Sequence, residues 1–159
     1  MRLTPEDFRP WPEPAATDAP GRTPVGWWMF ALKESHFPGM SYLWDQDRNR
    51  SLCPITSEIV ESIPGVTDAG FSALLPNTWI KPHVGLENHL FRAHLGIIVP
   101  EPELCVLEVD GEQKRWSEGE AFVFDDTFIH EAFNDGQAIR IVLMLCVSRA
   151  AYGFADSPA

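Results

Sequence analysis

The fold is decided by seven stretches of sequence: FSALL (71–75), TWIKPH (78–83), RAHLGIIV (92–99), LCVLEV (104–109), EAFVF (120–124), FIHEAF (128–133) and IRIVLMLCV (139–147). Each stretch is short, rich in β-branched and aromatic residues, and bounded by turn residues, which is typical of a β-strand. Between LCVLEV and the strand-like EQKRW (112–116), Asp110-Gly111 predicts a β-hairpin. A further turn is predicted at 117–119, where the sequence reads SEG.

About seven or eight strands within roughly 80 residues favour an all-β double-stranded β-helix, the jelly-roll or cupin-like barrel. The alternative is an immunoglobulin-like sandwich, but the chain lacks a Cys, Trp, Cys pattern at suitable spacing. Polar residues recur inside otherwise apolar strands. If these residues line the inside of a barrel, they indicate a binding site.

The rest of the chain predicts little further structure. Prolines at positions 5, 10, 12, 14, 20 and 24 favour an extended arm over residues 1–24, which either wraps the domain or stays mobile. Apolar residues at helical spacing predict one short helix over 55–63, capped by Thr56 or Ser57 and stopped by Pro64-Gly65. Because one core serves roughly 100 to 200 residues, a length of 159 predicts a single domain over 25–159.

Charge and cysteine content exclude several classes of partner. With 12 Lys and Arg against 23 Asp and Glu, the net charge is -11, so nucleic acid and anionic membranes are expected to be repelled. No apolar run approaches the roughly 18 residues of a membrane span. The 3 cysteines are few, odd in number and far apart, which favours free thiols in a reducing compartment. A cytoplasmic enzyme is the simplest expectation, and its oligomeric state is left open.

Two histidines and one arginine carry the expected chemistry. His83 ends a predicted strand and His130 lies in another, so their side chains can converge on one metal ion. Either histidine alone would more often be an ordinary surface or core residue. Arg140 lies in an apolar strand, where a buried guanidinium demands an anion. A dicarboxylate such as 2-oxoglutarate is one candidate, and an internal salt bridge is the alternative.

The sequences PHVGLENHLFRAHLG (82–96) and WSEGEAFVFDDTFIHEAFN (116–134) resemble the aspartyl/asparaginyl β-hydroxylases. The resemblance covers residues 70–148, whereas 1–65 show no recognisable pattern. It implies that His83 and His130 bind iron(II) and that Arg140 and Ser72 hold the distal carboxylate of 2-oxoglutarate. It also implies that Arg92 and His94 complete the pocket. In RAHLG these two residues alternate with apolar ones, so both can face the barrel interior. There Arg92 would neutralise a co-substrate or substrate carboxylate, and His94 would donate a hydrogen bond.

The chain departs at one position from most two-histidine iron oxygenases, and at another from members of this family. Gly85 stands where most two-histidine iron oxygenases place a carboxylate, a departure that is also typical of this family. Leu90 stands where family members commonly carry a basic residue, which leaves the substrate open. Asp125 and Asp126 are expected to orient a metal-bound imidazole or a strand turn, and Glu131 to point away from His130. Two further family positions, Asn88 and Trp116, are expected to be structural.

The expected function is therefore that of an iron(II)- and 2-oxoglutarate-dependent dioxygenase. It would use dioxygen to hydroxylate a C–H bond, at the β-carbon of an Asp- or Asn-like amino acid that is free, peptidyl or carrier-bound. One alternative is a related halogenase, because Gly85 leaves room for chloride. A non-catalytic cupin-like binding module is another. A zinc hydrolase is the third, although three protein ligands would be expected for it and two are evident.

Overall fold

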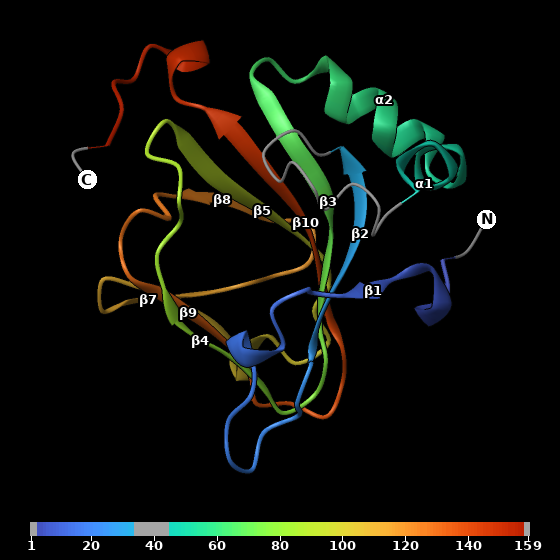
Figure 1. The fold of residues 1–159 in the computed structure, drawn as a ribbon, viewed down its shortest axis with the longest axis vertical. Coiled ribbons are helices and arrows are strands. Elements are labelled where there is room, and N and C mark those ends of the chain that lie inside the picture. The colour runs from blue at the N-terminus through green and yellow to red at the C-terminus, as the bar shows by residue number, and fades with distance from the viewer. Residues whose placement is uncertain (1–2, 34–44, 158–159) are drawn as a thin grey trace.

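A computed structural model describes residues 3–33 and 45–157, and two antiparallel sheets dominate it (Figure 1). The six-stranded sheet has the order β1 (Arg9–Pro10), β2 (Trp27–Lys33), β3 (Val66–Leu74), β10 (Arg140–Ser148), β5 (Leu90–Ile98) and β8 (Ala121–Phe124). The four-stranded sheet has the order β4 (Thr78–His83), β9 (His130–Asn134), β6 (Cys105–Val109) and β7 (Glu112–Arg115). The predicted all-β jelly-roll class is confirmed.

The two sheets pack through a shared core rather than through a continuous ladder. Buried residues from both sheets meet in one cluster: Leu74, Ile80, Val99, Cys105, Leu107, Trp116, Ala132 and Val142. Within residues 3–33 and 45–157, no named strand of one sheet pairs with a strand of the other. The expected barrel is therefore open along its sides, because its strand edges are not closed by hydrogen bonds.

The predicted hairpin is present between β6 and β7. Asp110 and Gly111 have φ of 49° and 81°, the left-handed conformation that a two-residue hairpin turn requires at both positions. The predicted turn at 117–119 instead carries the chain from the four-stranded sheet back to the six-stranded one, and Gly119 adopts φ 77°. All three cysteines are free, as expected.

The helical region contains two helices, α1 (Gln46–Leu52) and α2 (Pro54–Ser62), which contact β2 and β3. The predicted helix over 55–63 corresponds to α2, but its predicted caps are wrong. Cys53 occupies the N-cap position and Pro54 the first turn, where proline's missing N–H costs no hydrogen bond. Of the apolar residues that predicted α2, Val60 is buried, whereas Ile55 remains 73% exposed.

The N-terminal segment lies along the six-stranded sheet. Its β1 pairs with β2, beyond a short 3-10 helix at Pro5–Asp7, and a second such helix follows at Pro14–Ala16. Phe8 is buried against Phe30. The segment therefore wraps the domain, which is one of the two behaviours expected of it, whereas a domain boundary at residue 24 stays a prediction. The described helices include none with the length and apolarity to cross a membrane.

Candidate active site

One cavity between the two sheets brings together all six residues that the sequence singled out. Its volume is about 500 Å³. Ser72 comes from β3, His83 from β4, Arg92 and His94 from β5, His130 from β9 and Arg140 from β10. Because strands alternate their side chains, Ser72, Arg92, His94, His130 and Arg140 line the cavity while their immediate chain neighbours do not. Around His83 the ladder is irregular, and its neighbours Pro82 and Val84 also line the cavity.

His83 and His130 are directly opposite each other in the antiparallel β4–β9 ladder. Their ring centroids lie 4.2 Å apart with an interplanar angle of 52°. His83 is exposed at the cavity mouth and His130 is buried. Glu131 lies on the other face of β9, where it accepts a hydrogen bond from Trp79 Nε1 at 2.7 Å, as its expected orientation requires.

The hydrogen bonds of the two imidazoles suit metal coordination. Nδ1 of His83 lies 2.8 Å from the Lys81 carbonyl, and Nδ1 of His130 lies 2.9 Å from the Phe128 carbonyl. A carbonyl oxygen only accepts, so Nδ1 is the protonated nitrogen in each neutral ring. Nε2 therefore keeps its lone pair, the state that a metal ligand needs.

Burial also favours the neutral form of His130. Removal from water lowers the pKa of its imidazole, the Phe128 carbonyl opposes this, and nearby His83 lowers it again. The described residues hold no group of three or more His, Cys, Asp and Glu side chains placed for a metal ion. The donor set that the chain offers here is thus a pair of imidazoles, which suits a divalent ion that keeps open positions for other ligands.

Packing explains why position 85 carries no carboxylate. A Cβ on Gly85 would lie 2.5 Å from Cγ of Asp126, and the Gly85 N–H donates to the Asp126 carbonyl at 2.6 Å. The Asp126 carboxylate in turn accepts from Arg92, with Nη2 to Oδ2 at 2.6 Å and Nε to Oδ2 at 3.1 Å. An ion pair therefore fills the space that a side chain at position 85 would need.

This ion pair differs from the expected roles of both partners. Asp126 was expected to orient an imidazole or a turn, and Arg92 to neutralise a substrate or co-substrate carboxylate. Instead their charges meet each other within the protein. Asp125 does hold the turn before His130, because it accepts hydrogen bonds from the backbone and hydroxyl of Thr127, and it also pairs with Arg149. The expectation for the turn is thus met by Asp125.

Arg140 is buried without an acidic partner in the described part of the chain. Its side chain is 2% exposed, and its guanidinium lies 4.5 Å above the Trp116 ring. Nη1 donates to the Ser72 carbonyl at 3.3 Å, whereas Nε is buried with no hydrogen-bond partner. Burial lowers the pKa of Arg140 to about 10, so the group stays charged at neutral pH. Among residues 3–33 and 45–157, no Asp or Glu pairs with it, which disfavours the internal salt bridge.

Two tryptophans donate hydrogen bonds to two further polar side chains of the cavity, His94 and Ser72. Trp116 Nε1 donates to His94 Nδ1 at 3.2 Å, and Trp27 Nε1 donates to Ser72 Oγ at 3.0 Å. Nε2 of His94 is buried and has no hydrogen-bond partner among residues 3–33 and 45–157. Burial, reinforced by Arg140 and Arg92, lowers the pKa of His94 well below its usual value. His94 is therefore a neutral imidazole at neutral pH.

The sequence missed the part of the cavity wall that the N-terminal segment supplies. Trp11 and Glu13 line the cavity, and Trp11 stacks on Trp27 with ring centroids 4.3 Å apart. The sequence WPEPAATDAPGRTPVGWW (11–28) contains three tryptophans, which could have indicated an apolar contact. The neighbouring residues do not predict which strand these tryptophans pack against. Leu90 also lines the cavity, so the position that is commonly basic in the family contributes an apolar wall here.

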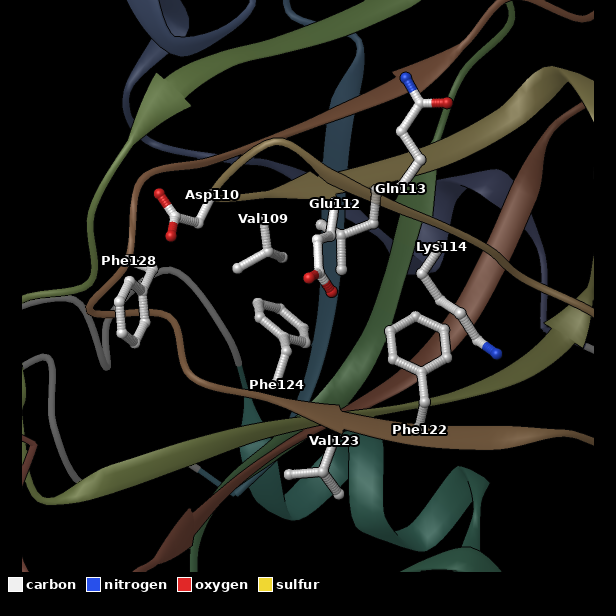
Figure 2. A pocket seen from close by; sticks show the side chains of 10 residues that line it. Val109, Asp110, Glu112, Gln113, Lys114, Phe122, Val123, Phe124 and Phe128 are labelled. Atoms are coloured by element: carbon white, nitrogen blue, oxygen red, sulfur yellow. The ribbon is translucent and has the colours of Figure 1, made fainter.

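Figure 2 shows a second cavity, of about 390 Å³, between the β6–β7 hairpin and β8. Phe122 and Phe124 point toward the hairpin, whereas Val123 points away from it. Leu107 and Phe124 line both cavities, so they separate this space from the histidines. None of the six predicted site residues lines it.

Comparison with known proteins identifies relatives in sequence and in structure. An ornithine lipid ester-linked acyl 2-hydroxylase from Rhizobium tropici is 41% identical over 100 residues, which are 62% of this chain and 36% of that protein. The aspartyl/asparaginyl beta-hydroxylase of Homo sapiens is 34% identical over 114 residues, 66% of this chain and 15% of that protein. The chain thus spans about a third or less of these relatives. A predicted oxalate decarboxylase from Thermotoga maritima is structurally similar, with TM-score 0.48, 11% identity, and coverage of 77% of this chain and 80% of that one.

The family match is wider than the sequence motifs alone indicated. The model of the family described as aspartyl/asparaginyl beta-hydroxylase matches residues 2–150, including the N-terminal segment in which no pattern was recognised. The match contains every residue of the cavity described above. The chain belongs to the aspartyl/asparaginyl beta-hydroxylase family.

Proposed function

We propose that the protein is an iron(II)- and 2-oxoglutarate-dependent dioxygenase that hydroxylates a C–H bond. The observation that carries this proposal is the content of one cavity. It holds two facing imidazoles whose Nδ1 atoms contact backbone carbonyls, and a buried guanidinium that has no acidic partner among the described residues. The imidazoles suit a divalent metal, and the guanidinium suits the distal carboxylate of a dicarboxylate. Membership of a hydroxylase family supports the same reaction type.

The roles of the chain's residues follow from their positions. His83 and His130 would hold iron(II), and Arg140 with Ser72 would bind the distal carboxylate of 2-oxoglutarate. His94 would donate Nε2–H to an oxygen of the bound acid, because that donor is buried and otherwise unpartnered. Iron(II), 2-oxoglutarate and dioxygen together supply the oxidising chemistry, while the protein orients the substrate C–H bond and limits access of water.

The substrate proposal starts from the chemistry that the two relatives share. The β-carbon of an aspartyl residue and carbon 2 of an acyl chain both lie next to a carbonyl carbon. We therefore propose a C–H bond adjacent to a carbonyl, in an amino-acid or lipid-linked substrate. Leu90 in the cavity wall and the exposed Val84 and Leu86 at its lining favour an apolar substrate portion beside that carbonyl.

The test is anaerobic addition of iron(II) and then 2-oxoglutarate to the protein. The wild type is expected to show a visible charge-transfer absorbance and, once air is admitted, to release succinate. His83→Ala is expected to lose both, because one imidazole cannot replace two ligands. His89→Gln is the matched control. This histidine lies on the connection between β4 and β5 but does not line the cavity, so the absorbance of the variant should match that of wild type.

The outcomes separate the proposal from its alternatives. Succinate release that persists in His83→Ala would contradict the assigned ligands. Absence of the absorbance in the wild type would favour a non-catalytic binding module. The mass of the product, measured with chloride present, distinguishes hydroxylation from halogenation.

A further inference from the structure

We propose that Trp27 and Trp116 are positioning residues that make the co-substrate end of the cavity a set of hydrogen-bond donors, and that the N-terminal segment holds Trp27 in place. The inference rests on the proposed function, since the expected ligand is the carboxylate of 2-oxoglutarate. It concerns two residues that touch other side chains of the site and act through them.

Trp116 fixes the tautomer of His94. The indole N–H can only donate, so His94 Nδ1 must be the unprotonated, accepting nitrogen in the 3.2 Å contact. The proton of the neutral ring is then on Nε2, the atom that is buried without a partner in the cavity. Trp116 is 1% exposed and also carries the Arg140 guanidinium on its face, so it orients two donors at once.

Trp27 orients the hydroxyl group of Ser72 in a comparable way. A hydroxyl can donate or accept, but Oγ of Ser72 accepts from Trp27 Nε1 at 3.0 Å. The hydroxyl proton is then left to donate elsewhere, and within the part of the chain that the structure describes no acceptor takes it. Ser72 is buried beside Arg140, whose Nη1 bonds to the Ser72 carbonyl.

The result is a cradle that presents donors from three side chains: Ser72 Oγ–H, His94 Nε2–H and the guanidinium of Arg140. A carboxylate has only acceptors, so it can satisfy all of them. A neutral amide or a cation leaves at least one buried donor unpaired, which weakens its binding. The two tryptophans thus make the cavity selective for an anion without adding a further charge.

The N-terminal segment contacts the site through Trp11. The rings of Trp11 and Trp27 are stacked, with centroids 4.3 Å apart and an interplanar angle of 19°. β1 pairs with β2, the strand that begins with Trp27, so the segment fixes both the backbone and the ring of this residue. Loosening the stack should let the Trp27 indole turn away from Ser72. The segment is therefore expected to influence co-substrate affinity although it supplies no ligand.

The test uses three double-mutant cycles, with the dissociation constant of 2-oxoglutarate measured anaerobically on the iron(II)-loaded protein. Trp116→Phe and Trp27→Phe each keep an aromatic ring and remove the N–H, and each should weaken binding about three- to tenfold. In a His94→Ala background Trp116→Phe should have no further effect, and the same holds for Trp27→Phe in a Ser72→Ala background. Trp11→Ala should weaken binding in wild type but not in Ser72→Ala. Additive effects in any of the three cycles would overturn the proposal.

The control is Trp79→Phe. Its indole also donates to a side chain, Glu131, but on the face of β9 that points away from the cavity, so affinity should be unchanged. Nitrogen-15 NMR of the metal-free protein provides a reading independent of 2-oxoglutarate. His94 should be protonated at Nε2 and not at Nδ1, and the reverse would contradict the proposal. If wild type binds no 2-oxoglutarate, the proposed function fails. The NMR result still decides whether His94 presents an Nε2–H donor to the cavity.

Discussion

Arg140 has surroundings that suit a ligand better than they suit the folded protein alone. Its guanidinium is removed from water, rests on an aromatic ring and pairs with no acidic residue of the described chain. Burial of an unpaired charge destabilises a fold, because the lost hydration is not replaced. A residue that lowers stability in the free protein and gains a partner in the complex is typical of a binding site.

Replacing Arg140 by Met should separate these two effects. The side chains are similar in length, and Met removes the buried charge, so the metal-free variant is expected to unfold with a free energy equal to wild type or about 1 kcal/mol higher. Its affinity for 2-oxoglutarate should fall about 100-fold, the usual cost of leaving a charged partner unpaired. Denaturant unfolding and anaerobic titration measure the two quantities. Strong destabilisation of the metal-free variant would indicate a structural role instead.

At the scale of secondary-structure elements, the connection between β9 and β10 determines where Arg140 enters the cavity. Asn134 ends β9 and is fully buried. Its Nδ2 donates to the carbonyls of Leu74, Leu75 and Ala138, and its Oδ1 accepts from the Gly136 N–H. One side chain thus joins β3, β9 and the loop that leads into β10.

Asn134→Ala is expected to lower the free energy of unfolding by about 2 to 3 kcal/mol, because it leaves buried carbonyl groups without donors. The loss should be visible in urea unfolding monitored by circular dichroism. Asn88→Ala is the comparison, since its side chain makes a single long contact, 3.5 Å to the Ser157 carbonyl, and a change below about 1 kcal/mol is expected for it. Equal losses in the two variants would contradict a particular stabilising role for the Asn134 side chain.

For the whole molecule, the N-terminal segment is part of the packed domain. Phe8 is 7% exposed and contributes to the cluster that also contains Phe30, Leu32, Phe71 and Leu143. This cluster lies on the helix-bearing side of the six-stranded sheet, whereas Trp11 and Glu13 reach the cavity. The segment therefore connects the outer packing of the sheet with the site between the sheets.

Phe8→Ala should lower the free energy of unfolding by about 3 kcal/mol, the usual cost of truncating a buried phenylalanine. Ile55→Ala, on an exposed position of α2, should change it by less than about 0.5 kcal/mol. Thermal unfolding of both variants beside wild type provides the measurement. If Phe8→Ala is as stable as wild type, the segment does not belong to the cooperative unit.

Much of this protein follows from local sequence. Short runs rich in β-branched and aromatic residues and bounded by turn residues predicted the eight strands from β3 to β10, and Asp110-Gly111 predicted the hairpin, because both depend on residues close together in the chain. The strand β2 was not among the predicted runs. Residue type and motif resemblance singled out His83, His130 and Arg140 before any contact was visible.

Tertiary structure decided which partners these residues have. The β4–β9 register places His83 opposite His130, and Arg92 pairs with Asp126. The Asp126 carboxylate occupies the space that a side chain at position 85 would need. The placement of Trp27 and Trp11 at the cavity likewise depends on how β1 and β2 dock. Each of these contacts joins residues whose proximity is set by strand order and register. Local propensity contains no information on which distant strand will be the neighbour.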